Sequence, residues 1–231
     1  MADEAKQKRS KEEVLEIIIA IFLGVTALAT AWASWIGSLH GGNQATNYTT
    51  SNNLAADGNS RYNEASQNLM QDMMLWNQIS EASLNLTFAE ESGDDVEAEK
   101  YSYLLDQLMS DNATQEFLDA VNWALDQEDY ATPFDMEGYV DSYFEDAWAV
   151  LDESEALLEQ GKQDNSNGDK FGLVTVIYSV VLFMLGIVGT FKKLPNRYII
   201  TGVAIAGFLF ATIYMFTIPM PTGFNLFGFF G

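Results

Sequence analysis

The sequence contains no cysteine, one histidine (His40) and only 11 basic residues among 231. Without cysteine the chain has no disulfide, thiolate metal site or cysteine nucleophile, and a single histidine excludes a multi-histidine metal site. Binding to nucleic acid requires clustered Lys and Arg, so the formal net charge of -22 excludes a general nucleic-acid binder. Functions that depend on thiols, histidine clusters or phosphate contacts are therefore excluded.

Acidic residues are absent from the last 61 residues, although the chain contains 33 of them. Five lie in residues 3–16 and 28 lie in residues 57–169. The average composition resembles that of an acidic soluble domain, but it combines a very polar part with strongly apolar parts. The charge therefore belongs to one region of the chain.

Three runs lack formal charge and are long enough to cross a bilayer as helices. They are residues 17–39, with 23 residues, and residues 171–191 and 198–218, with 21 residues each. Helices of these lengths measure roughly 31 to 34 Å, against a hydrocarbon core of about 30 Å. The sequence therefore predicts an all-α integral membrane protein with three transmembrane helices and a turn at 192–197.

The basic residues predict the orientation of these spans. Seven of the 11 lie in residues 1–16 or 192–197, which predicts that both segments are cytoplasmic. Residues 40–170 and the tail 219–231 are then extracytoplasmic. A cleaved signal peptide is the alternative for the first span, but its apolar run exceeds the usual length of about 7 to 15 residues.

Residues 40–160 are predicted to form an acidic extracytoplasmic bundle of about four helices. Apolar residues recur every three or four positions from Tyr62 to Phe88, and further helices are expected after the turn at 92–95, after a cap at Ser110 or Asp111, and after Pro133. Residues 161–170 are polar and are predicted to be a linker. Gly161 is expected to end the helix before it.

The first part of this segment is predicted to continue the first span as one long helix. A seven-residue spacing connects the two parts, through Ser34, Gly41, Tyr48, Ala55, Tyr62, Leu69 and Trp76. The Gly41-Gly42 pair favours a break or a kink instead, because glycine is a poor helix former.

Two parts of the chain resemble a group of small bacterial three-span membrane proteins to which no activity is assigned. The similar parts are LGVTALATAWASWIGSLHGG with the following YNEAS, and the C-terminal LFMLGIVGTFKKLPNRYIITGVAIAGFLFATIYMFTIP. The resemblance implies a location in the bacterial inner membrane and a first span that runs into a long polar helix. It does not cover about residues 90–160, and it implies no catalytic motif or cofactor.

A row of hydroxyl residues at four-residue spacing occupies the first span: Thr26, Thr30, Ser34 and Ser38. In an oligomer such a row could line a polar pathway. Hydroxyls in membrane helices more commonly bond back to their own backbone, and the neighbouring alanines favour close helix packing.

The third span contains two pairs of small residues at four-residue spacing. Gly202 is paired with Ala206, and Gly207 with Ala211. Such pairs predict tight helix contacts, within one protomer or between the protomers of a homo-oligomer.

The carboxylates suggest at most weak cation binding. Asp126, Glu128 and Asp129 are a loose candidate for a divalent cation, and the acidic segment as a whole could attract cations diffusely. Such charge more commonly keeps a domain soluble. The run 164–169 departs from the EF-hand pattern.

Two functional hypotheses follow. No catalytic motif occurs, so no enzyme or cofactor is expected, and the spans lack the ionisable groups of a coupled transporter. A homo-oligomeric, cation-favouring pore with an acidic outer vestibule is the first hypothesis. The alternative is a non-conducting sensor or scaffold whose outer bundle binds a partner. His40 is interpreted as an interfacial polar residue, or as a pH-sensitive gate.

Overall fold

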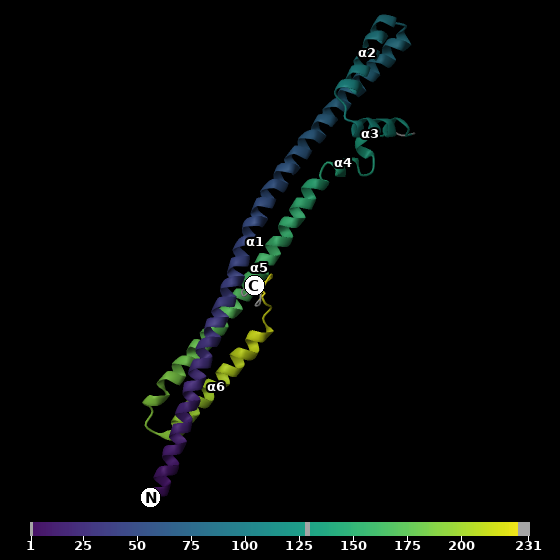
Figure 1. The fold of residues 1–231 in the computed structure, drawn as a ribbon. Helices are drawn as coiled ribbons and strands as arrows, with labels where there is room; N and C mark the ends of the chain where they lie inside the picture. The colour runs from purple at the N-terminus through teal and green to yellow at the C-terminus, as the bar shows by residue number, and fades with distance from the viewer. Residues whose placement is uncertain (1, 128–129, 226–231) are drawn as a thin grey trace. The chain divides into compact units, whose positions relative to one another are not determined.

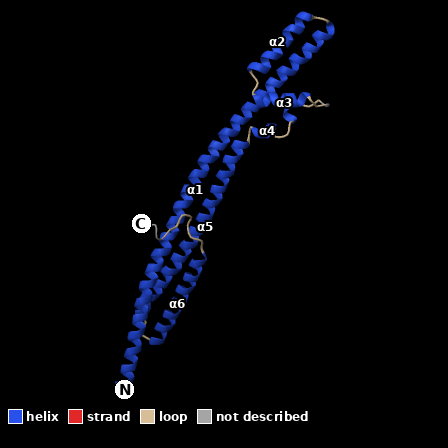
Figure 2. Ribbon diagram, turned by 45° about the vertical axis from the view of Figure 1, so that its right-hand side comes forward, coloured by secondary structure: helices blue, strands red, loops and turns tan. Residues whose placement is uncertain are grey.

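A computed structural model describes residues 2–127 and 130–225, with side chains from Lys11 onward. Within these residues every regular element is a helix and no strand occurs, which confirms the all-helical prediction (Figures 1 and 2). The elements are α1 (Ala2–Ser92), α2 (Asp95–Asp111), α3 (Gln115–Leu125), η1 (Pro133–Asp135), α4 (Tyr139–Ser142), α5 (Glu145–Ile187), η2 (Val188–Thr190) and α6 (Leu194–Thr217).

Three helices are long and apolar enough to cross a membrane. They are α1, α5 with its η2 extension, and α6. Each contains one of the three uncharged runs, except that the second and third runs extend one residue beyond the helical end. This arrangement suggests a multi-pass membrane protein. The turn before α6 is shorter than predicted, because Pro195 lies in the first turn of α6, where its missing N–H leaves no bond unmade.

The chain divides into two compact units. One, here called the apolar unit, comprises Met1–Thr50 and Ala156–Gly231; the other, the acidic unit, is Ser51–Glu155. Helices α1 and α5 contribute residues to both.

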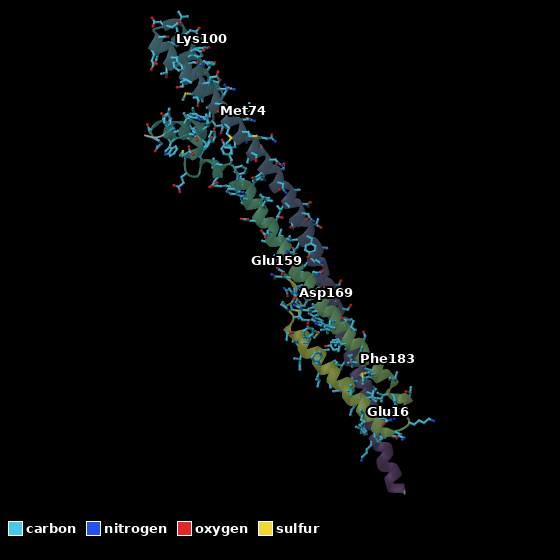
Figure 3. All side chains as sticks on the ribbon, turned by 180° about the vertical axis from the view of Figure 1, so that it is seen from behind. Glu16, Met74, Lys100, Glu159, Asp169 and Phe183 are labelled. Atoms are coloured by element: carbon cyan, nitrogen blue, oxygen red, sulfur yellow. The ribbon has the colours of Figure 1, made fainter. Side chains whose placement is uncertain are left out.

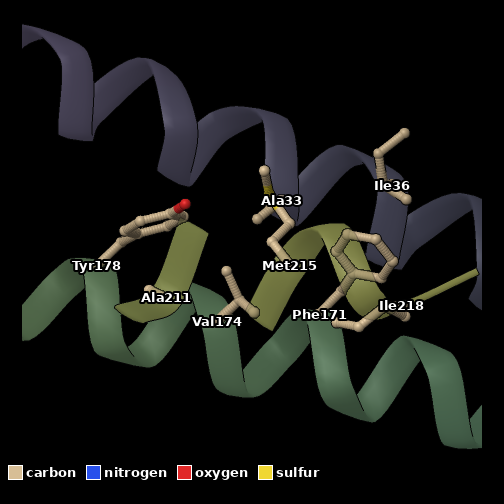
Figure 4. Packing of buried hydrophobic residues seen from close by; sticks show 8 residues of the cluster. All are labelled: Ala33, Ile36, Phe171, Val174, Tyr178, Ala211, Met215 and Ile218. Carbon is tan, nitrogen blue, oxygen red and sulfur yellow. The ribbon is translucent and has the colours of Figure 1, made fainter. Parts of the chain in front are cut away.

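The apolar unit is held together by side chains from its three long helices. Figure 4 shows the central cluster, formed by Ala33, Ile36, Phe171, Val174, Tyr178, Ala211, Met215 and Ile218. A second cluster consists of Leu15, Ile19, Val181, Leu185, Val188 and Ala204. Tyr178 adds a 2.9 Å hydrogen bond between its hydroxyl and Thr212 Oγ1, which satisfies a polar group inside the apolar packing.

The acidic unit has its own core, in which α1 packs against the shorter helices. The buried members are Leu75, Ile79, Ala82, Leu108, Phe117, Ala120, Val121 and Tyr139. Its helix starts are capped by side chains: Asp94 accepts a bond from the Glu97 amide in α2, and Thr114 accepts one from the Phe117 amide in α3.

Helix α1 is continuous through Gly41 and Gly42, so the predicted long helix is confirmed and no break occurs there. A mid-helix glycine costs up to about 1 kcal/mol relative to alanine. That cost is small beside the packing of α1 on both sides of the pair, where Ile36 and His40 are buried and Tyr48 packs against Gly161.

Three details of the predicted helix boundaries are wrong. Residues 161–170 are helical within α5 and form no linker, because Gly161 leaves room for the Tyr48 ring and Asp164 bonds to His40. The third helix is capped by Thr114, whereas Asp111 belongs to α2. The helix expected after Pro133 is divided into α4 and α5, with Tyr143 and Phe144 between them.

Candidate functional site

A buried polar cluster surrounds His40 in the apolar unit. The side chain is only 1% exposed, and its Nδ1 lies 2.7 Å from Asp164 Oδ1. Its Nε2 lies 3.1 Å from the carbonyl oxygen of Pro219, just after α6. The imidazole also stacks on Phe171, and Asn47 donates to the second oxygen of Asp164 at 3.3 Å. One side chain of α1 thus connects to α5 and to the segment that directly follows α6.

Both ring nitrogens of His40 face oxygen atoms. A neutral imidazole has one N–H donor, whereas the imidazolium has two. Whichever ring nitrogen carries a proton, it donates to one of these two oxygen atoms, so the ring is held between α5 and the segment after α6. The position suits structural linkage, since His40 is buried and contacts α5 and the segment after α6. Its location at the membrane interface and its role as a gate stay predictions.

The acidic unit contains a second polar cluster, centred on Asp72 of α1. The Tyr139 hydroxyl donates to Asp72 Oδ2 at 2.6 Å, and the Tyr143 hydroxyl donates to the same oxygen. Asp72 is buried, so these donors replace the water that a carboxylate would otherwise bind. The cluster connects α1 to α4 and its C-terminal end.

The ionisation of both tyrosines is suppressed. Burial, reinforced by the hydrogen bond to Asp72, raises the pKa of Tyr139 far above its usual range. The same two causes, in the same order, raise the pKa of Tyr143 to about 12. Because both hydroxyls remain protonated and donate to one carboxylate, the cluster lacks a free general base and is suited to holding the helices together.

A polar groove lies beside this cluster, within the acidic unit. Its lining contains four amide side chains, together with Asp72, Thr114, Tyr143, Met74 and Leu75; the amides belong to Asn68, Gln71, Gln78 and Asn112. Amides supply both donors and acceptors, so the groove offers hydrogen bonds without a net charge of its own beyond Asp72.

A row of exposed apolar side chains follows α1 through the acidic unit. Its members are 44% to 63% exposed; they are Met70, Met73, Met74, Leu84 and Phe88. The separations are multiples of about three to four residues, which places these side chains on one face of the helix. Buried Leu75, Ile79 and Ala82 point the other way, into the core. Met74 is labelled on α1 in Figure 3.

The predicted hydroxyl row does not share one environment. Thr26 is buried inside the apolar unit, and Thr30 is half-buried and donates to the Thr26 carbonyl at 2.7 Å. Ser34 and Ser38 are exposed. The row therefore turns from the interior of the unit to its outside.

The two pairs of small residues in α6 also differ. Ala211 is fully buried, and a Cβ added at Gly207 would approach Val181 Cγ2 to 3.2 Å, so this pair packs against α5. Gly202 and Ala206 are exposed, with open space at Gly202. Contacts of this second pair with another protomer stay a prediction.

The candidate cation site is only partly described. Asp126 is the C-cap of α3, whereas Glu128 and Asp129 lie outside the described residues. Among the residues that the structure describes, no group of three potential ligand side chains is placed to hold a metal ion.

The sequence did not predict either of the two polar clusters, around His40 and around Asp72. The sequence places Tyr139 and Tyr143 in the helix expected after Pro133 and Asp72 in the helix from Tyr62 to Phe88, but it does not indicate that they are polar partners. A signal was present, since Asp72 precedes Leu75, Ile79 and Ala82 at intervals of three and four and so occupies the buried face of α1. The partner of Asp164 depends on a contact 124 residues distant and had no local signal.

Comparison with known proteins adds no relative: no family model, curated protein or solved structure matches the chain. The resemblance to bacterial three-span proteins thus stays a prediction.

Proposed function

We propose that the protein is a non-enzymatic, multi-pass protein of the bacterial inner membrane, which holds a helical binding unit outside the cytoplasm. The N-terminus and the turn before α6 face the cytoplasm in this proposal. Seven basic residues, in residues 1–16 and in residues 192–197 at the start of α6, support that orientation. The acidic unit, with 25 acidic and 2 basic residues, is then extracytoplasmic.

The acidic unit binds another protein, and the observation that carries this proposal is the exposed apolar row of α1. Its five large side chains face away from the core that the same helix helps to form. Isolated exposed apolar residues are normal, but five large ones on one helix face, in two groups at 70–74 and 84–88, are typical of a surface that another protein covers.

A pore receives less support from the described residues. A channel lined by the hydroxyl row needs these side chains on one open face, whereas Thr26 is buried and Thr30 bonds to its own helix. The binding role, the alternative of the two sequence hypotheses, is therefore the one we propose.

Photocrosslinking in intact cells tests the binding role. A photoreactive amino acid at Leu84 should give a discrete adduct with a second protein, and Phe88→Glu should abolish it by placing a charge in the same row. Ser83 provides the matched control, because it is exposed and adjacent in sequence but points about 100° away around the helix. Equal adducts from Ser83 and Leu84, or none from either, would contradict the proposal.

A further inference from the structure

The apolar row of α1 has the dimensions of a helix-binding surface. From Met70 to Phe88 it extends 18 residues, roughly 27 Å along the helix axis. An amphipathic helix of about five turns presents apolar side chains over the same length, at the same three- and four-residue intervals.

The methionine-rich composition of the row suits contact with the side chains of a partner helix. Three of its five members are methionines, at positions 70, 73 and 74. Methionine is unbranched and polarizable, so it adapts to partner side chains of different shapes and is common on helix-binding surfaces. Leu84 and Phe88 add larger anchors at the other end of the row.

The charge around the row determines which helix it can accept. The acidic unit has 25 acidic and 2 basic residues, and exposed Glu81 lies within the row itself. Both basic side chains are already paired, Arg61 with Asp57 at 3.0 Å and Lys100 with Glu97 at 2.8 Å. The surface around the row is therefore strongly negative. Arg61 and Lys100 each neutralise a neighbouring carboxylate and do not offset the negative potential of the remaining acidic residues.

A second copy of this chain is a poor occupant for the same reason. Two acidic units in contact would each bring a formal charge of about -23, and like charges brought together in an interface cost several kcal/mol. A partner rich in Lys and Arg gains attraction from the same field and associates faster because of it.

We infer that the exposed row of α1 docks a cationic amphipathic helix of another protein. This inference rests on the proposed binding function and names the chemistry of the partner. The apolar face of that helix covers the methionines, Leu84 and Phe88, while its Lys and Arg side chains flank the contact and face Glu81 and the surrounding carboxylates.

A synthetic helix tests the inference on the full chain in nanodiscs of zwitterionic lipid. The probe is an 18-residue Leu/Lys peptide with leucines at helical spacing, and the control peptide has the same composition without an apolar face. Asn77 is exposed within the row, and the chain lacks cysteine, so a thiol-reactive dye attaches only at Asn77→Cys and reports locally. The local reporter separates docking on α1 from peptide bound to lipid.

The amphipathic peptide should change the Asn77 signal saturably, and the control peptide should not. Leu84→Glu should weaken binding at least 10-fold, whereas Ser83→Glu, which adds the same charge beside the row, should leave it nearly unchanged. Raising the salt concentration should weaken binding, because the attraction is screened. Absence of a saturable change, or equal effects of the two glutamates, overturns the inference.

The outcomes also separate this inference from the proposed function. If the Leu84 photocrosslink in cells captures a protein while the cationic peptide fails, the partner has a different chemistry and only this inference is wrong. A signal change that grows with the number of protein copies per nanodisc and needs no peptide identifies a second copy as the occupant, which also overturns it. Failure of both experiments contradicts the binding function itself.

Discussion

The imidazole of His40 lies 2.7 Å from the carboxylate of Asp164, although 124 residues separate them in the sequence. The other ring nitrogen reaches the Pro219 carbonyl. The pair thereby connects α1, α5 and the segment after α6, at the C-terminal end of the apolar run of α1. We therefore expect the packing of these three segments to depend on the His40–Asp164 pair.

Replacing Asp164 by Ala should destabilise the apolar unit by about 3 kcal/mol, because it leaves His40 buried without its charged partner. Thermal unfolding in detergent micelles, followed by tryptophan fluorescence, measures the change. Asp169→Ala is the control, since Asp169 is exposed on the same helix. Similar unfolding temperatures for the two variants would show that the pair does not hold the helices together.

The tyrosine cluster should make the acidic unit less stable at high pH. The pKa of Tyr143 is raised from its usual 10.0 to about 12, so between these values the folded state retains a proton that the unfolded state has lost. Stability is therefore fully present below pH 10 and falls as the pH rises towards 12. Denaturant unfolding across this interval, followed by circular dichroism, should show the fall.

Tyr143→Phe should remove the Tyr143 share of this alkaline loss, with the Tyr139 share left in place, and should lower stability at neutral pH by about 1 to 2 kcal/mol because Asp72 loses a donor. The exposed Tyr103 gives the control substitution, Tyr103→Phe, which should leave the alkaline loss in place. An unchanged pH profile in Tyr143→Phe would contradict the assignment of the effect to this cluster.

The sequence was sufficient to predict the elements whose signal is local. The uncharged runs coincide with parts of α1, of α5 with η2, and of α6, to within one residue at their ends, and Asp94 caps α2 at the predicted turn. The error at 161–170 has a physical cause: composition alone favours a polar loop, but Gly161 and Asp164 make contacts with α1 that keep the segment helical. Tertiary contacts here outweigh local preference.

The candidate binding surface was less accessible to sequence reasoning. The spacing of Leu69, Met70, Met73, Trp76 and Ile79 predicts a helix but does not separate its buried residues from its exposed ones. Only the packing of α1 against α2 and α3 shows that Leu75 and Ile79 are buried while Met70, Met73 and Met74 are exposed.

Glycines along α1 should respond to alanine in opposite directions. A Cβ at Gly41 or Gly42 meets nothing within 4 Å, so alanine should stabilise the helix by up to about 1 kcal/mol. At Gly58 a Cβ would lie 2.7 Å from Leu151 Cγ, so alanine should destabilise the acidic unit despite its better helix propensity. Denaturant unfolding of the three variants gives the sign of each change. Destabilisation by Gly41→Ala would contradict a continuous, unobstructed α1.

Thr26→Val should leave stability unchanged or raise it by about 1 kcal/mol. The Thr26 hydroxyl is buried, and no hydrogen-bond partner is found for it among the described residues, so an isosteric apolar side chain removes an unsatisfied group. Thermal unfolding measures this effect. A clear loss of stability, or a change in ion conductance across reconstituted bilayers, would instead favour the pore hypothesis.

The most direct test of the account is the side of the membrane on which the acidic unit lies. Because the native chain has no cysteine, Ser80→Cys in the acidic unit and Lys193→Cys before α6 each introduce a single thiol, both at exposed positions. A membrane-impermeant maleimide applied to intact spheroplasts should label Ser80→Cys and should label Lys193→Cys only after the membrane is disrupted. Labelling of Lys193→Cys in intact spheroplasts, or protection of Ser80→Cys, would contradict the proposed topology and with it the extracytoplasmic binding unit.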